Sequence, residues 1–173
     1  MKIYRDMSQA ELNAGYNNLA AVAESRYWVS RWPERSKAVR ARSSTVLDIR
    51  YGDAPRCVLD YFPCGVPDAP LFIFFHGGYW LRNHKDMFSF IAEGPCAHGF
   101  NVAVPGYTLA PGARLSQIVS EAELSASFLA KSAARLGFRL DRIIAGGWSA
   151  GGHLAATLMD HPNVRGVLGI SER

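Results

Sequence analysis

Four short runs of almost purely apolar residues, separated by segments with helical periodicity, constrain the fold of this chain more than any other feature. A strand that is covered on both faces has no polar side, so such runs are typical of buried parallel strands. The clearest helix between them is predicted over 114–136, where apolar residues form a stripe and Gly137 stands at a C-terminal cap position. This order predicts an α/β fold, an open and mostly parallel sheet with helices on both faces and active loops at the carboxyl ends of its strands. The four runs are 71–75, 101–104, 142–145 and 166–170.

The first part of the chain predicts a helix followed by a polar arm. Ser8 and Glu11 form a capping-box pattern, and apolar residues then recur at three- and four-residue intervals. Pro33 is expected to end this helix, because proline removes a backbone donor and clashes with the preceding turn. The arm leads to two strand-like segments, 45–49 and 57–62, which turn-forming residues join into a hairpin.

Length and composition are those of one ordinary globular domain. The chain has 173 residues, of which 49% are hydrophobic and 20% charged, which is enough for one sizeable core. We expect one domain over 1–173, with the N-terminal helix and arm over about 1–43 and the sheet core over about 44–173. Asp6 and Glu11 interrupt the N-terminus where a signal peptide would be apolar, and no apolar run is long enough to span a bilayer. We therefore expect a cytoplasmic protein without a membrane partner.

The sequence disfavours several classes of partner and cofactor. Part of the net charge of +4 is concentrated in the basic stretch 26–42, which could hold nucleic acid, but no reading motif accompanies it and a solvated arm is the preferred interpretation. The cysteines are odd in number and lack CxxC spacing, so reduced, buried thiols are expected rather than disulfides or a zinc site. No phosphate-binding or dinucleotide fingerprint occurs, and the histidines lack metal-binding spacing, so no metal or other cofactor is predicted. The basic residues are Arg26, Arg31, Arg35, Lys37, Arg40 and Arg42, and the cysteines are Cys57, Cys64 and Cys96.

Residues 147–151 read G-W-S-A-G and match the G-x-S-x-G pattern. In this pattern a strained strand-to-helix turn exposes the serine oxygen, and the glycines leave room where a Cβ atom would clash. The match lies between a buried-type strand and a run rich in small residues, which is the context that the turn requires. Ser149 is therefore the predicted nucleophile, the alternative being a serine in a tight turn.

A glycine turn at 76–78 directly follows the first buried strand. Hydrolysis of an ester or amide passes through an oxyanion, and backbone amides fixed near that oxygen supply much of the rate. We assign the predicted oxyanion hole to the N–H groups of Gly77, Gly78 and Ala150, the last at a helix N-terminus whose dipole favours negative charge. His76 is predicted to support this loop by hydrogen bonding. The alternative is a glycine turn that only joins a strand to a helix.

Three segments, H-G-G-Y-W at 76–80, Y-T-L-A-P at 107–111 and G-W-S-A-G-G-H at 147–153, resemble the α/β-hydrolase superfamily and its kynurenine formamidase (arylformamidase) and esterase branch. The resemblance extends over about 8–170. It implies an α/β-hydrolase fold, of which the chain would hold the N-terminal two-thirds without the last strands. It also implies hydrolysis of aryl formamides or small carboxylic esters without a metal, by a Ser-Asp-His triad with Ser149 as the nucleophile.

Two departures from that branch bear on the substrate and on activity. Trp148 stands where the branch usually has histidine, and no evident acid and base follow Ser149. His161 would lie at the far end of a helix, on the order of 16 Å from the serine oxygen, and His153 lacks an orienting carboxylate. We therefore expect the N-terminal part of a hydrolase of roughly 250 to 280 residues, with 166–170 as an exposed edge strand. Such an edge invites pairing, which would give a homodimer, or aggregation.

The preferred function is a serine hydrolase of the arylformamidase or carboxylesterase type, acting on a small-molecule aryl ester or amide through a Ser149 acyl-enzyme. The second interpretation is a catalytically inactive fragment or pseudoenzyme that lacks the triad acid and histidine. A nucleic-acid binder is the least favoured. Tyr79, Trp80 and Trp148 are predicted either to line an aromatic substrate pocket or to serve only in packing.

Overall fold

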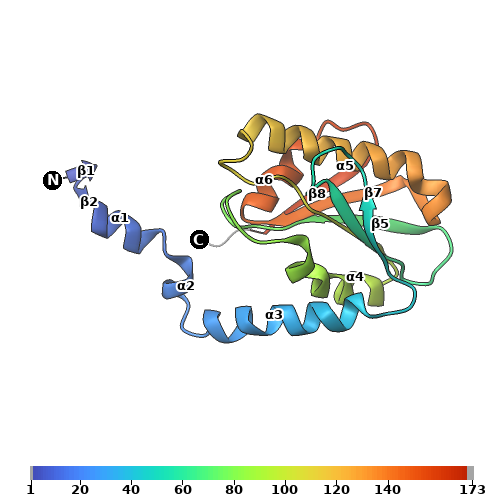
Figure 1. Ribbon diagram of the computed structural model, residues 1–173, viewed down its shortest axis with the longest axis horizontal. Coiled ribbons are helices and arrows are strands. Elements are labelled where there is room, and N and C mark those ends of the chain that lie inside the picture. The colour runs from blue at the N-terminus through green and yellow to red at the C-terminus, as the bar shows by residue number, and fades with distance from the viewer. Residues whose placement is uncertain (1, 171–173) are drawn as a thin grey trace.

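The computed structural model describes residues 2–170 and contains a six-stranded sheet with the strand order β3-β4-β6-β5-β7-β8 (Figure 1). β6, β5, β7 and β8 run parallel to one another, whereas β3 and β4 extend the sheet in antiparallel orientation. The predicted α/β fold with a mostly parallel sheet is therefore confirmed, and so is the leading hairpin. The strands are β3 (Val46–Arg50), β4 (Val58–Phe62), β5 (Ala69–Phe75), β6 (Asn101–Pro105), β7 (Phe138–Trp148) and β8 (Val164–Ile170).

Helices cover both faces of this sheet (Figure 1). Each face has its own buried apolar cluster, because successive side chains of a strand point to opposite sides. On β5, Ile73 and Phe75 belong to the cluster shared with α5 and α6, whereas Phe74 belongs to the cluster that contains Phe88. α5 ends before Gly137, whose φ of 74° gives the predicted left-handed cap. One face carries α5 (Leu115–Leu136) and α6 (Ala150–Thr157), and the other carries α3 (Ser25–Arg40), the 3-10 helix η1 (Lys85–Ala92) and α4 (Glu93–Ala97).

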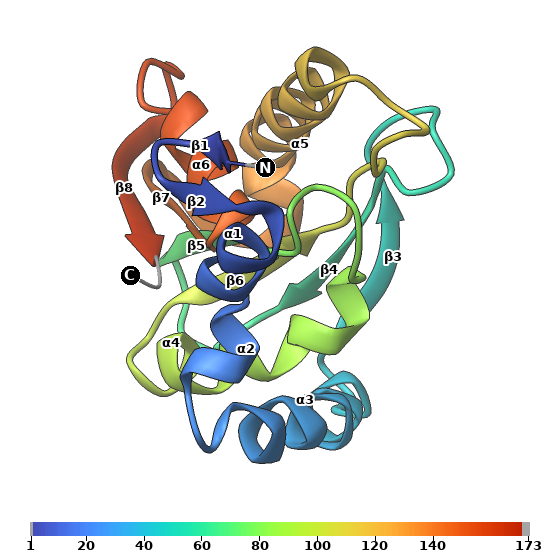
Figure 2. The same ribbon diagram turned by 90° about the vertical axis from the view of Figure 1, so that its left-hand side faces the viewer.

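The N-terminal region differs from the predicted single helix that ends at Pro33. Ser8 does cap a helix, with both halves of the capping box formed, but this helix is short and a second one follows it. Both project toward the viewer in Figure 2. α3 then runs through Pro33, where the sequence predicts a polar arm. Packing explains the difference, because Trp32 stacks on Phe90 with ring centroids 5.5 Å apart and holds α3 against the sheet layer. The first elements are β1 (Lys2–Tyr4), β2 (Met7–Ser8), α1 (Gln9–Gly15) and α2 (Asn18–Ala21).

Most of the basic stretch, residues 26–40, is consequently part of helix α3 and not an arm without regular structure. Arg40 forms an ion pair with the buried Asp60, and Arg35 forms one with Glu93. These two ion pairs connect α3 to the rest of the protein, while every basic side chain of the stretch except that of Arg40 stays exposed.

The three cysteines are free thiols, as the sequence predicts. Cys57 is buried, but Cys64 and Cys96 are only half-buried, so the expectation of burial was wrong for two of the three. Between residues 2 and 170, no helix combines the length and the apolar composition that crossing a membrane requires.

Candidate active site

Ser149 lies at a sharp turn between the end of β7 and the start of α6. Its backbone has a φ of 53° and a ψ of −117°, and a positive φ is strained for a residue with a side chain. A Cβ atom at Gly147 would lie 2.2 Å from the backbone of Gly151, and one at Gly151 would lie 2.0 Å from the carbonyl oxygen of Phe75. Glycine alone fits at both positions, which confirms the steric reason inferred from the pattern. The amide of Ser149 donates to the carbonyl of Ile170 at 2.7 Å and so ties the turn to the end of β8.

The glycine turn 76–78 lies beside this serine because β5 and β7 are adjacent and parallel, so their carboxyl ends meet. A Cβ atom at Gly77 would lie 3.2 Å from the Cβ of Ser149. Gly77, Gly78 and Ala150 are all buried, and within residues 2–170 none of their amides donates a hydrogen bond. Buried amides in proteins are nearly always paired. The Gly77 backbone lies against Ser149 and Gly78 lines the same cavity as Ser149, so these unpaired amides are available to donate to an acceptor in this region.

His76 supports the glycine turn from beneath. It is fully buried, its ring stacks on that of Tyr107 with centroids 4.3 Å apart, and its Nδ1 lies 2.9 Å from the carbonyl oxygen of Gly77. Burial lowers the pKa of His76 to about 4, so the ring is neutral near pH 7. Because the Gly77 oxygen can only accept, Nδ1 carries the ring proton and donates it to this bond. The hydroxyl of Tyr107 donates to the His76 carbonyl at 2.6 Å, which fixes the same turn a second time.

A cavity of about 260 Å³ opens at Ser149. Tyr79 and Trp148 line it, so two of the three predicted pocket aromatics lie beside the serine. Trp80 is not among the lining residues, because its ring packs edge-on against His153 with centroids 5.2 Å apart.

No imidazole of residues 2–170 forms a hydrogen bond with the hydroxyl of Ser149. His153 follows one turn later on α6, and its backbone amide donates to the Ser149 carbonyl at 3.2 Å, but its ring packs on Trp80. His161 lies within hydrogen-bonding distance of Ser127, 3.0 Å from its hydroxyl. The described residues thus supply the serine and the amide donors without a general base.

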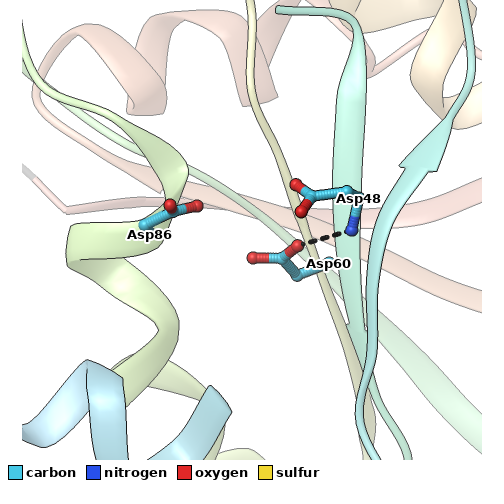
Figure 3. Close-up of side chains that lie close together, drawn as sticks. All are labelled: Asp48, Asp60 and Asp86. Carbon is cyan, nitrogen blue, oxygen red and sulfur yellow. Dashed lines mark hydrogen bonds between the residues drawn. The ribbon is translucent and has the colours of Figure 1, made fainter.

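Three carboxylates from β3, β4 and η1 lie close enough together to be a candidate metal site. The carboxylates of Asp48, Asp60 and Asp86 offer oxygens within 4.8 Å of one another (Figure 3). The ammonium group of Lys85 lies 2.7 Å from Asp48 and Asp60 and 2.9 Å from Asp86, and Arg40 pairs with two of the three. Burial alone would lower the pKa of Lys85, but hydrogen bonds to the three carboxylates outweigh it and raise that pKa. We call these five residues the Lys85 cluster; its own cations occupy the place that a metal ion would need.

Residues 61–165 match the protein family described as BD-FAE. The chain belongs to the BD-FAE family. Relatives of this BD-FAE chain include the kynurenine formamidases of Danio rerio, 31% identical over 167 residues, and of Salmo salar, 29% identical over 168 residues. Both matches cover 92% of the BD-FAE chain but only 56% and 55% of the relatives, so it spans just over half of their length.

Solved structures support the same assignment. A proposed thioesterase from Silicibacter sp. TM1040 superposes on the BD-FAE chain with a TM-score of 0.77 at 32% identity, covering 89% of this chain and 57% of that one. MGS-M1, an α/β-hydrolase enzyme from a deep-sea metagenome library, superposes with a TM-score of 0.65 at 28% identity, covering 73% and 57%. These findings confirm that the BD-FAE chain is an α/β-hydrolase of the arylformamidase and esterase branch, as its three sequence segments predict.

Two residues at the site of this BD-FAE protein escape prediction from the sequence. Trp32 of α3 lines the cavity, with its ring edge-on to that of Trp148 at 5.5 Å, and helical periodicity gives no sign of that contact. Asn83 also lines the cavity and donates from Nδ2 to the Gly77 carbonyl at 2.9 Å. Its φ of 79° is a conformation that asparagine tolerates better than most residues, so an asparagine after a glycine turn is a weak signal for it.

Proposed function

We propose that the chain carries the nucleophile and the oxyanion-binding amides of a serine hydrolase that acts on small aryl formamides or carboxylic esters. The observation that carries the proposal is the strained turn at Ser149 facing the buried, unpaired amides of Gly77 and Gly78. A turn of this kind has no evident structural benefit, since both its strain and its unpaired donors cost free energy.

In the proposed reaction, the oxygen of Ser149 attacks the carbonyl carbon of the substrate and its proton passes to a general base. The carbonyl oxygen becomes an oxyanion and accepts hydrogen bonds from the amides of Gly77, Gly78 and Ala150. Collapse of this adduct breaks the bond to the leaving amine or alcohol, which takes up the proton, and leaves an acyl group on Ser149. Water then releases the acid by the same two steps.

The walls of the cavity support an aryl substrate. Trp32, Tyr79 and Trp148 present three aromatic rings within a volume of about 260 Å³, and such rings bind flat apolar groups by offset or edge-on contacts. The kynurenine formamidases among the relatives are consistent with a formamide as the reacting group, and the esterase branch to which the chain belongs is consistent with an ester. No metal enters this proposal, because the Lys85 cluster is filled by its own cations and the amides can stabilise the charge alone.

The absence of an imidazole bonded to Ser149 within residues 2–170 favours a second candidate, a binding or inactive form of the same site. Its cavity would still receive a small acyl compound, but the serine would stay protonated and unreactive. Labelling with a fluorophosphonate separates the two candidates, because an unactivated serine reacts very slowly.

The deciding experiment measures hydrolysis of an aryl formamide and of a short-chain aryl ester by the chain and by Ser149→Ala. Where a general base from outside residues 2–170 completes the site, we expect turnover that Ser149→Ala abolishes, together with fluorophosphonate labelling of the parent protein alone. Equal rates for the two proteins would remove Ser149 from the mechanism. Absence of both turnover and labelling would favour the inactive candidate.

A further inference from the structure

The turn that carries the proposed oxyanion donors is built from two adjacent glycines, and this creates a problem of orientation. Glycine accepts a wide range of backbone angles, so the peptide unit between Gly77 and Gly78 has little intrinsic preference for one orientation. A flip of that unit would replace the Gly78 N–H by the Gly77 carbonyl, which repels an oxyanion. An oxyanion site at this position therefore needs something that holds the peptide unit in place.

Two side chains hold the Gly77 carbonyl. Nδ1 of His76, the residue before Gly77, donates to it at 2.9 Å. Nδ2 of Asn83, six residues after Gly77, also donates to it at 2.9 Å. The peptide is trans, so its C=O and N–H point in opposite directions. Fixing the oxygen with two donors therefore points the Gly78 N–H away from them. Ser149 and Gly78 line the same cavity, and the Gly77 backbone lies against Ser149.

Asn83 is itself held firmly. Its carbonyl accepts a hydrogen bond from Nη2 of Arg56 at 2.8 Å, and Nε of the same guanidinium donates to the Tyr107 carbonyl at 2.7 Å. Lys85, two residues further along, is fully buried within the Lys85 cluster. Hydrogen bonds through Arg56 therefore connect the Asn83 backbone to the loop that holds Tyr107, and the buried Lys85 anchors the segment that follows.

We propose that Asn83 is a positioning residue that, together with His76, aims the Gly78 amide at the oxyanion. The inference rests on the proposed function for its catalytic consequence, but the clamp on the peptide unit can be measured without turnover. Asn83 acts through Gly78 and does not touch the reacting atoms.

The variant Asn83→Asp tests the clamp, because aspartate keeps the size and the tolerance of a positive φ but replaces the donor by a carboxylate. Asn83→Gly is the second variant, since glycine also accepts the φ of 79° and removes the side chain without adding charge. Asn163→Asp makes the same chemical change just before β8, at the end of the parallel sheet opposite to Ser149, and serves as the control.

The first readout is the ¹H–¹⁵N NMR signal of the Gly78 amide in the 173-residue chain. We expect both Asn83 variants to shift this signal in an otherwise preserved spectrum, and the control to leave it in place. The second readout is aryl ester hydrolysis, where we expect kcat to fall by about 10- to 100-fold with KM nearly unchanged, because an oxyanion donor acts in the transition state.

A Gly78 signal that stays in place in both Asn83 variants would overturn the clamp. An unchanged kcat in a parent enzyme that depends on Ser149 would overturn its catalytic role while leaving the proposed function intact. If the parent protein and Ser149→Ala do not differ in turnover, the proposed function fails, and the NMR readout still decides whether Asn83 orients the peptide unit.

Discussion

Replacing Lys85 by methionine tests whether the Lys85 cluster stabilises the fold. The cluster contains three carboxylates and two cations, and Lys85 is the cation that contacts all three carboxylates. Lys85→Met leaves the fully buried Asp60 with Arg40 as its remaining cation. Breaking a buried ion pair by removing one partner costs about 3–5 kcal/mol, and since Arg40 still pairs with Asp60 we expect about 3 kcal/mol.

Urea unfolding at neutral pH measures this loss, and a thermal scan should show a Tm lower by about 6–12 °C, at about 2–4 °C for each kcal/mol in a chain of this size. Lys131→Met, which removes an exposed lysine on α5, is the matched control and should change the free energy of unfolding by less than about 0.5 kcal/mol. A loss below about 1 kcal/mol for Lys85→Met would refute the reasoning.

The pH dependence follows from the directions of two pKa shifts. The pKa of Lys85 is raised in the folded protein, so its stabilisation is present below the ordinary value of 10.5 and is lost as the pH rises beyond it. The pKa of Asp86 is lowered by its contacts with Lys85, which outweigh burial, so its stabilisation is present above the ordinary value of 3.8 and is lost as the pH falls below it. The difference between the parent protein and Lys85→Met should therefore be largest between these two values.

Three further changes test the site. Gly151→Ala should prevent stable folding, because the new Cβ would lie 2.0 Å from a backbone oxygen. The control Gly166→Ala, with no atom within 4 Å of its new Cβ, should alter the free energy of unfolding by about 1 kcal/mol or less. Similar urea unfolding curves for the two variants would contradict this. The pKa of His76 is lowered from 6.5 to about 4 by burial, so the unfolded chain binds a proton that the folded one does not, and stability should fall by about 3 kcal/mol as the pH drops through this window. His76→Gln should lose that part of the pH dependence, and an unchanged slope in urea titrations would argue against it. Trp148→Ala should raise KM for aryl esters by about three- to tenfold relative to alkyl esters, and an equal rise for both would separate Trp148 from aryl binding.

The parts of the fold that the sequence predicts are those set by local pattern. The strand β5 and its parallel neighbours follow from apolar runs, because a strand that is buried on both faces needs apolar side chains at nearly every position. The turn at Ser149 follows from its glycine pattern, in which Gly147 has to clear the backbone of Gly151 within the same turn and Gly151 has to clear the carbonyl of Phe75 on β5. α5 and its cap at Gly137 follow from periodicity and from the one residue type that accepts a positive φ without cost.

The parts that escape prediction depend on contacts between distant segments. α3 continues through Pro33 because Trp32 packs on η1, and the sequence around Pro33 does not predict that contact. The Lys85 cluster draws its charges from four separate segments, so no spacing in the sequence reveals it. The role of Asn83 becomes visible only in the structure, because it depends on a hydrogen bond to the carbonyl of Gly77, six residues earlier in the chain.

The hydrogen bond from the Ser149 amide to the Ile170 carbonyl has a consequence for how the site depends on the rim of the sheet. Among the described strands β8 is outermost on its side, and Ile170 is its last residue. The conformation of the turn at Ser149 is thus tied to an edge strand of the described sheet. Local unfolding of the end of β8 would break this hydrogen bond and increase the mobility of Ser149 before it disturbs the core. Any contact that stabilises β8 therefore also stabilises the backbone conformation at Ser149.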